Sequence, residues 1–403
     1  MNAPGLPTPV VVNGHPTDLP HRVCARCVQD TSVPGIRFDA AGVCNFCALH
    51  DELARTFPKG VAGRAALARM ADGIRKRGKN DAFDCVVGVS GGRDSTWLLW
   101  CAVKEWGLRP LAVHFNDGFD NPVAGENMVR ACDRLGVELR TVTSDWREGK
   151  DLKLAFLEAS VPDLNLGTDI GIASSLYGVA TKAGVRSILI GQSFRTEGIK
   201  PLSWSFFDGD YLRAVHARFG RVPLRPWEPE RPGFHLGLKE LAWYALRQRI
   251  RVHTPLYFAD YVRSEAEAVI KGELGWVYPG AHYFDDLYHS LLKWVHRVKF
   301  NIDLNMNSDS ALVREGQMSR DAALARAHGV YAIEDPKVID LCIKRLGLTR
   351  ADMDRILALP PKTFRDYPTS RPTMERLKPA IWAASRAGLI PRVTYDKYFR
   401  CGE

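Results

Sequence analysis

Residues 83–100 constrain the fold most, because they join a short apolar run, a glycine loop and a helical pattern. Residues 85–89 predict a buried β-strand, and the residues from Ser95 onward predict a helix. Gly91 and Gly92 allow a sharp turn and a close approach of the backbone to a bulky anion. The amides of the loop and of the first helical turn then face outward at the positive end of the helix dipole. This arrangement is typical of a phosphate-binding site.

The side chains of the loop fit the same interpretation. Ser90, Ser95 and Thr96 supply hydroxyl groups, and Arg93 supplies a positive charge. Asp94 is unusual beside a phosphate unless Mg²⁺ lies between the carboxylate and the phosphate oxygens. The loop has neither the Gly-x-x-x-x-Gly-Lys nor the Gly-x-Gly-x-x-Gly pattern of other nucleotide sites. The alternative is an ordinary tight turn between a strand and a helix.

Short β-branched runs alternate with helical patterns from residue 83 to residue 191. This alternation predicts an α/β fold, a doubly wound parallel sheet with helices on both faces. The predicted strands are 84–89, 110–115, 137–142 and 185–191. Ligands of such sheets bind at the carboxyl ends of the strands, here the loops 90–96, 114–121, 143–150 and 191–200.

The predicted domain organisation has five parts: a flexible tail (1–20), a zinc ribbon (21–60), a linker helix (61–80), the α/β domain (81–235) and a helical C-terminal domain (236–403). The first residues lack the features of a signal peptide, and no apolar run approaches the ~20 residues that span a bilayer. We therefore expect a soluble, cytoplasmic protein without membrane contact.

Four of the nine cysteines form two Cys-x-x-Cys pairs, Cys24 with Cys27 and Cys44 with Cys47. Sixteen residues separate the pairs, a spacing typical of one tetrahedral Zn²⁺ ion. Four thiolates leave no open coordination position, so the zinc is expected to be structural. Redox-active cysteine pairs and an Fe–S cluster remain as alternatives.

The net charge of +9 favours anionic partners such as ATP, a sugar nucleotide or nucleic acid. The positive charges are spread along the chain without an arginine-rich tract, so small polyanions are favoured and nucleic acid is not expected. The loop after the fourth predicted strand brings together Arg195, Glu197 and Lys200. Charged groups at that position suit a carbohydrate or nucleotide substrate, and a solvated loop is the alternative.

The sequence Ser90-Gly-Gly-Arg-Asp-Ser95 resembles the PP-loop of the ATP pyrophosphatase superfamily. Beyond it, the chain resembles the N-acetyl sugar amidotransferases of surface-polysaccharide biosynthesis, a branch of that superfamily. The similar segments, in order, are residues 24–32, 38–47, 90–96, 196–204, 214–220, 257–266, 275–282, 316–324 and 360–367. The chain departs from the family pattern at 281–286 and 303–310, where several expected cations are absent.

The resemblance implies that ATP activates an N-acetyl group of a sugar or sugar nucleotide. The amide oxygen attacks the α-phosphorus, pyrophosphate leaves, and ammonia then displaces AMP to give an acetamidino group. It implies that Mg²⁺ binds Asp94, and that His282 is a general acid or base, unless this histidine is structural. Arg195, Glu197 and Lys200 become substrate or transition-state residues. The implied ATP-binding residues are Ser90, Gly91, Gly92, Arg93, Asp94, Ser95, Thr96, Val113, His114, Phe115, Gly191 and Gln192.

Residue 2 is Asn, and no cysteine lies in a Gly-x-Cys-x-Gly elbow, so we expect no glutaminase within this chain. The resemblance implies a separate glutaminase subunit that delivers ammonia. Two other functions remain open: a PP-loop tRNA thiolase or other adenylating ligase, and a non-catalytic scaffold of a polysaccharide-modifying complex.

Overall fold

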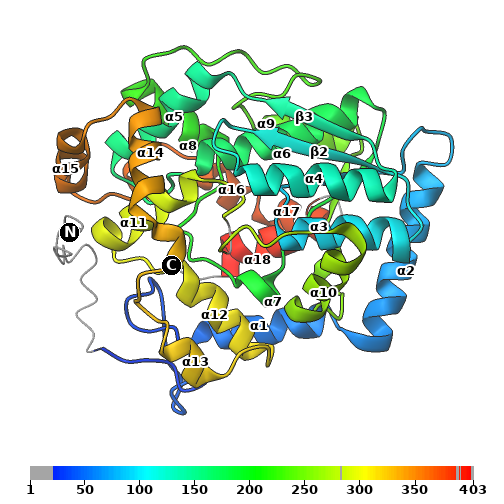
Figure 1. Ribbon diagram of the computed structural model, residues 1–403, viewed down its shortest axis with the longest axis horizontal. Helices are drawn as coiled ribbons and strands as arrows, with labels where there is room; N and C mark the ends of the chain where they lie inside the picture. The colour runs from blue at the N-terminus through cyan, green and yellow to red at the C-terminus, as the bar shows by residue number, and fades with distance from the viewer. Residues whose placement is uncertain (1–20, 282–283, 387–389, 391, 401–403) are drawn as a thin grey trace.

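The computed structural model describes residues 21–281, 284–386, 390 and 392–400. Its centre is a sheet of five parallel strands in the order β3-β2-β1-β4-β5 (Figure 1). The strands are β1 Cys85–Gly88, β2 Pro110–Asn116, β3 Leu139–Thr143, β4 Ser187–Leu189 and β5 Arg251–His253. The direction of winding reverses between β1 and β4, so the loops after these strands border one crevice. The predicted fold class is confirmed.

Alternate residues of each strand point to opposite faces of the sheet and belong to two hydrophobic layers, one on each face. Val86 and Ile188 pack on the face covered by α5 (Trp146–Ala159), α6 (Leu166–Lys182) and α8 (Gly209–Phe219). Val87 and Leu189 pack on the face covered by α2 (Gly60–Arg77), α3 (Arg93–Trp100) and α4 (Pro122–Leu135). Both faces are buried, which explains why the strands read as continuous apolar runs.

The C-terminal half is helical and wraps around the carboxyl end of the sheet (Figure 1). Its helices are α9 Leu238–Ala242, α10 Arg263–Leu274, α11 Tyr288–Phe300, α12 Leu304–Arg314, α13 Arg320–Leu324, α14 Pro336–Leu346, α15 Arg350–Ala358, α16 Arg371–Arg376, α17 Lys378–Arg386 and α18 Arg392–Arg400. Among the helices in the described ranges, none is both long enough and apolar enough to cross a membrane.

The structure differs from the prediction in the region after residue 235. Strand β5 pairs with β4 there, so the predicted boundary at 235 does not separate the sheet from the helical region. The predicted linker helix, residues 61–80, corresponds to α2 (Gly60–Arg77), and a separate helix, α1 (Asn45–Thr56), lies within the predicted ribbon. Pro58 lies between them, where proline interrupts helical hydrogen bonding. The predicted tail, residues 1–20, lies outside the described residues.

Candidate functional site

The glycine loop after β1 has a backbone conformation that only glycine adopts easily. Gly91 has a φ of +73°, and a Cβ atom there would lie 1.9 Å from the carbonyl oxygen of Ala124 on α4. The Gly91 carbonyl accepts hydrogen bonds from Trp276 Nε1 at 2.9 Å and Asn127 Nδ2 at 3.2 Å. These contacts fix the turn from three directions. Contacts with other parts of the protein therefore determine the conformation of this loop.

Helix α3 follows the loop, and in the described part of the chain no side chain caps its first amides. Ser95 Oγ accepts from the Ser90 amide at 3.1 Å, and the two serine hydroxyls lie 3.1 Å apart. Thr96 is buried and donates to the Gly92 carbonyl at 2.7 Å, which stabilises the first turn. Uncapped amides beside paired hydroxyls form a suitable site for a phosphate group.

Two acidic side chains border this loop. Asp94 accepts from Arg93 Nε at 3.2 Å and from the hydroxyl of Tyr261. The predicted nucleotide contact Arg93 is largely engaged within the protein, because it also contacts Glu267 at 3.3 Å. Asp285 is the second acid: a Cβ atom on Gly92 would lie 3.2 Å from its Oδ2. Burial raises the pKa of Asp285, and the nearby charge of Asp94 acts in the same direction.

Sequence reasoning did not identify Asp285 as a site residue, although the Phe-Asp-Asp run at 284–286 was noted as a departure from the family pattern. The residue comes to the loop because Asn121, the cap of α4, ties the two segments together. The Asn121 amide donates to the Asp285 carbonyl at 3.0 Å, and its side chain donates to the Phe284 carbonyl at 2.7 Å. A contact across more than 160 residues has no local sequence signal.

The predicted adenine-binding residues lie at the carboxyl end of β2. The Val113 carbonyl accepts from the Val89 amide at 3.0 Å, as a ladder bond of the sheet. His114 lies between the Val89 carbonyl, 3.1 Å from Nδ1, and Asp120, 2.8 Å from Nε2. Burial opposes protonation of His114, but Asp120 outweighs it and the pKa is raised. Phe115 lines a cavity of about 210 Å³ between the end of β3 and residues 225–234.

The loop after β4 meets the glycine loop, as predicted from the topology. A Cβ atom on Gly191 would lie 3.1 Å from the Asp94 carbonyl oxygen, so the two segments touch there. Gln192 follows, and helix α7 (Phe194–Glu197) begins after Ser193, whose side chain caps it at the Arg195 amide. The two loops of the crevice are therefore packed directly on each other.

Arg195 is buried in an ion-pair network that joins three segments. Its Nη1 contacts Glu315 at 2.5 Å, Nη2 donates to the Phe57 carbonyl at 2.6 Å, and Nε donates to the Tyr257 carbonyl at 3.1 Å. Glu315 also binds His50 at 3.0 Å and Lys59 at 2.7 Å. All three guanidinium nitrogens thus face protein acceptors. This geometry gives Arg195 a structural role in place of the predicted substrate contact.

Replacing Arg195 by Met is expected to lower the free energy of unfolding by about 3–5 kcal/mol, because Glu315 loses its buried partner. The matched control is Arg64→Met, since Arg64 pairs with Asp260 on the surface and an exposed pair contributes only about 0–1 kcal/mol. Chemical denaturation measures both variants. A stable Arg195→Met protein without activity would restore the predicted catalytic role.

Glu197 and Lys200 remain the charged candidates of this loop. Burial raises the pKa of Glu197 to about 7 and the charge of Asp94 adds to the effect, while Lys200 acts in the opposite direction. Lys200 also opposes the raised pKa that burial gives Asp169. A carboxyl group that titrates near neutrality beside a lysine can exchange a proton with a substrate. His282, the predicted acid or base, lies outside the described residues.

The raised pKa of Glu197 predicts a pH dependence of stability. The folded state holds the proton more tightly, so the stabilisation is complete below pH 4.5 and is lost as the pH rises through about 7. Glu197→Gln should remove the contribution of this one proton to the change of the free energy of unfolding with pH. Chemical denaturation at a series of pH values from 4 to 8 measures this change. Asp163, whose pKa burial also raises to about 7, retains its contribution in both proteins. If the free energy of unfolding changed with pH identically in the wild type and in Glu197→Gln, the pKa of Glu197 would not be raised by folding.

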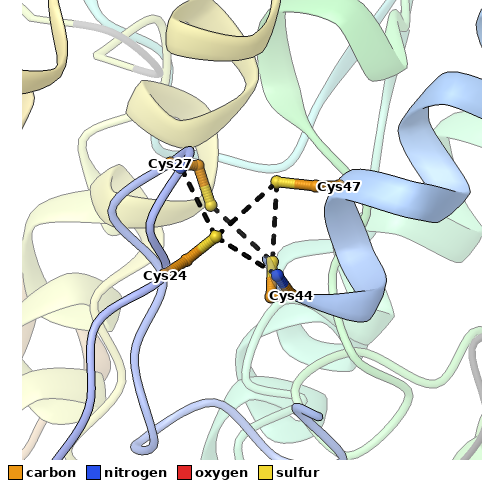
Figure 2. Close-up of side chains that lie close together, drawn as sticks. All are labelled: Cys24, Cys27, Cys44 and Cys47. Atoms are coloured by element: carbon orange, nitrogen blue, oxygen red, sulfur yellow. Dashed lines mark hydrogen bonds between the residues drawn. The ribbon is translucent and has the colours of Figure 1, made fainter. Parts of the chain in front are cut away.

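The second candidate site is the four-cysteine cluster of the N-terminal ribbon (Figure 2). The sulfur atoms of Cys24, Cys27, Cys44 and Cys47 converge within 4.8 Å of one another, and all four residues are buried. The Sγ–Sγ distances include 3.9 Å for Cys24–Cys47, 3.7 Å for Cys27–Cys44 and 3.6 Å for Cys44–Cys47. The predicted cluster is confirmed as a group of ligands that can hold a metal ion.

The fold and its two candidate sites define an α/β protein with a glycine loop after β1 and a four-cysteine centre. Residues 281–379 match the family model described as LPS biosynthesis protein WbpG-like, C-terminal domain, which confirms the predicted resemblance over this region. No curated protein sequence matches the chain.

Solved structures similar to the chain include two synthetases and one tRNA thiolase. An NH3-dependent NAD synthetase from Campylobacter jejuni is 16% identical, with a TM-score of 0.32 and coverage of 65% of this chain and 96% of that chain. The U34-tRNA thiolase NcsA from Methanococcus maripaludis, solved with a [4Fe-4S] cluster, is 14% identical, with a TM-score of 0.31 and coverage of 74% and 88%. An NMN synthetase from Francisella tularensis is 13% identical, with a TM-score of 0.34 and coverage of 74% and 97%.

Proposed function

We propose that the protein is an ATP-dependent amidotransferase of lipopolysaccharide or other surface-polysaccharide biosynthesis. It adenylates the N-acetyl group of a sugar or sugar nucleotide and replaces the amide oxygen with ammonia, giving an acetamidino group. The observation that carries the proposal is the rigid Gly91 turn beneath an uncapped helix, opposite a loop of titratable groups. The match of residues 281–379 to a lipopolysaccharide-biosynthesis family supports the choice of pathway.

The reaction needs an activated oxygen because an amide is a poor electrophile. The amide oxygen attacks the α-phosphorus of ATP, and the bond to the β-phosphate breaks with release of pyrophosphate. Amides of Gly91 and Gly92 with the hydroxyls of Ser90 and Ser95 hold the departing diphosphate. Asp94 and Asp285 border the same loop and would hold Mg²⁺, which neutralises the charge that develops on the phosphate oxygens.

Ammonia then attacks the imidate carbon, and AMP leaves with the former amide oxygen. The nitrogen must lose a proton in this step. Glu197 is our candidate acceptor, because a carboxyl group with a pKa of about 7 is efficient near neutral pH. Lys200, whose charge acts on Glu197, is our candidate contact for the negative charge of AMP or of the sugar substrate. These assignments leave Arg195 to hold α7 in position.

The ammonia source is proposed to be a separate glutaminase subunit. A nucleophilic cysteine needs a lowered pKa and access to substrate. Outside the four-cysteine cluster, the described cysteines are all buried. Burial raises the pKa of Cys85 and of Cys101, raises that of Cys132 to about 11, and raises that of Cys342 to about 12. This environment also disfavours a thiolase that would use one of these cysteines.

The four-cysteine centre is proposed to hold structural Zn²⁺. Four thiolates at a Zn–S distance of about 2.3 Å in a tetrahedron lie about 3.8 Å apart. The observed separations of 3.6–3.9 Å match this value. In a four-iron cluster each thiolate binds a different iron atom of the cube, so the ligand sulfurs lie farther apart.

The proposed reaction is tested with the purified chain, ATP, Mg²⁺ and ammonium, against a panel of nucleotide-activated acetamido sugars and tRNA. We expect one sugar to stimulate release of AMP and pyrophosphate and to gain the mass change of oxygen replaced by NH. Glutamine should replace ammonium only after a glutaminase subunit is added. Stimulation by tRNA with no response to any sugar would contradict the proposal and favour a thiolase.

A further inference from the structure

Helix α12 lies between the cysteine ribbon and α7 (Figure 1). On the ribbon side, Arg314 at its C-terminal end reaches the metal ligands: Nε is 3.2 Å from Cys47 Sγ and Nη2 is 3.2 Å from Cys27 Sγ. Arg314 is therefore a charged link between α12 and the metal-binding group.

On its other side, α12 holds the loop that carries Glu197. Asn307 Nδ2 donates to the Glu197 carbonyl at 2.8 Å. The next residue, Gly198, has a φ of +74°, and a Cβ atom there would lie 2.8 Å from Asn307. The backbone of the loop thus lies directly against α12, at the residue where α7 ends.

Gln29 connects these two contacts. Its Oε1 accepts from Arg314 Nη2 at 2.6 Å, and its Nε2 donates to Asn307 Oδ1 at 3.0 Å. Gln29 is 0% exposed and Asn307 is 1% exposed. A buried chain of polar contacts therefore runs from the cysteine sulfurs through Arg314, Gln29 and Asn307 to the backbone of Glu197.

We propose that the four-cysteine metal centre positions the Glu197 loop through Gln29 and Asn307, in addition to stabilising the ribbon. The inference rests on the proposed function only for the catalytic role of Glu197. A divalent ion with four thiolates carries a net charge of about −2, which Arg314 partly neutralises. Without the metal the four sulfur positions are no longer fixed, so the contacts of Arg314 with Cys27 and Cys47 are no longer held in this geometry. Asn307 is then a positioning residue that transmits this change.

Hydrogen–deuterium exchange of the full chain tests the inference, with peptides covering residues 193–200. Asn307→Ala should keep one zinc per chain but raise exchange in this loop about 10-fold or more, because it removes the hydrogen bonds of Asn307 to the Glu197 carbonyl and to Gln29. Gln29→Ala, one step nearer the metal, should give the same pattern. Removal of zinc from the wild-type protein with a chelator should also raise exchange at residues 193–200. The control Arg26→Ala alters an exposed pair with Asp51 on the same ribbon and should leave the loop unchanged.

Unchanged exchange at 193–200 in zinc-free protein or in Gln29→Ala would overturn the inference. So would a rise that is equal in the loop and in strands β1 and β2, since that indicates general destabilisation. If Asn307→Ala does not fold, Gln29→Ala and the wild-type chelation experiment still decide the question. None of these readouts uses ATP or a sugar, so a negative result here leaves the proposed reaction standing, and failure of the reaction leaves this coupling standing.

Discussion

Gly91→Ala is expected to abolish ATP-dependent pyrophosphate release, with a loss of about 10³-fold or more. Alanine at a φ of +73° costs about 1–2 kcal/mol. Its Cβ would lie 1.9 Å from the Ala124 carbonyl oxygen, so the loop must move away from α4, at a further cost of about 1–3 kcal/mol. A shift of about 1 Å in the diphosphate-binding amides is enough for a 10²-fold loss, and each lost donor adds to it.

Gly136→Ala is the matched control. Gly136 ends α4 at a φ of +64°, but a Cβ atom there meets nothing within 4 Å. It therefore carries the same conformational strain without the collision and away from the loop. Its activity should equal that of the wild type. Release of pyrophosphate at the wild-type rate by Gly91→Ala would show that the loop is only a turn.

Loss of the metal should have the second large effect. Cys44→Ser is expected to remove bound zinc and lower the free energy of unfolding by about 4–5 kcal/mol or more, because metal loss is among the few large destabilising changes. The ribbon also packs on α13 through Arg320, which donates to the Cys24 carbonyl at 2.8 Å and the Cys27 carbonyl at 3.1 Å. Elemental analysis and thermal unfolding measure the two effects.

Cys132→Ser serves as the control, since Cys132 is equally buried but lies outside the cluster. A buried hydroxyl in its place costs about 1–3 kcal/mol and should leave the zinc content unchanged. Full zinc content and wild-type melting of Cys44→Ser would contradict a four-thiolate site. Iron in place of zinc in the purified protein would support the cluster alternative.

The glycine loop, four strands of the sheet and the four-cysteine set could be predicted because each has a local signal. Gly91 and Gly92 follow an apolar run, and the Cys-x-x-Cys pairs have a diagnostic spacing. Helix α12 could not be predicted, since its first half reads Leu-Asn-Met-Asn-Ser-Asp-Ser and these polar residues favour caps and turns. Tertiary contacts stabilise it instead: Asn305 accepts from Lys293 at 2.7 Å, and Ser310 accepts from the Val28 amide at 3.3 Å.

The roles of single charged residues were the least predictable part of the site. The sequence predicts a shared role for Arg195, Glu197 and Lys200 because all three lie in one loop. Its partner Glu315 lies 120 residues away, so no sequence pattern reports that the guanidinium is already paired. Asp285 was missed for the same reason. Strand β5 has only three residues, too few for a periodic signal, and is formed by pairing with β4.

The central claim is that the loop from Ser90 to Ser95 holds the diphosphate that leaves ATP. A crystal structure with Mg²⁺ and an ATP analogue that cannot be cleaved between the α- and β-phosphates tests it most directly. We expect the β- and γ-phosphates on the amides of Gly91 and Gly92, with the metal ion between them and Asp94. An analogue bound with its phosphates elsewhere, or a loop without phosphate in crystals grown at saturating analogue, would contradict the account.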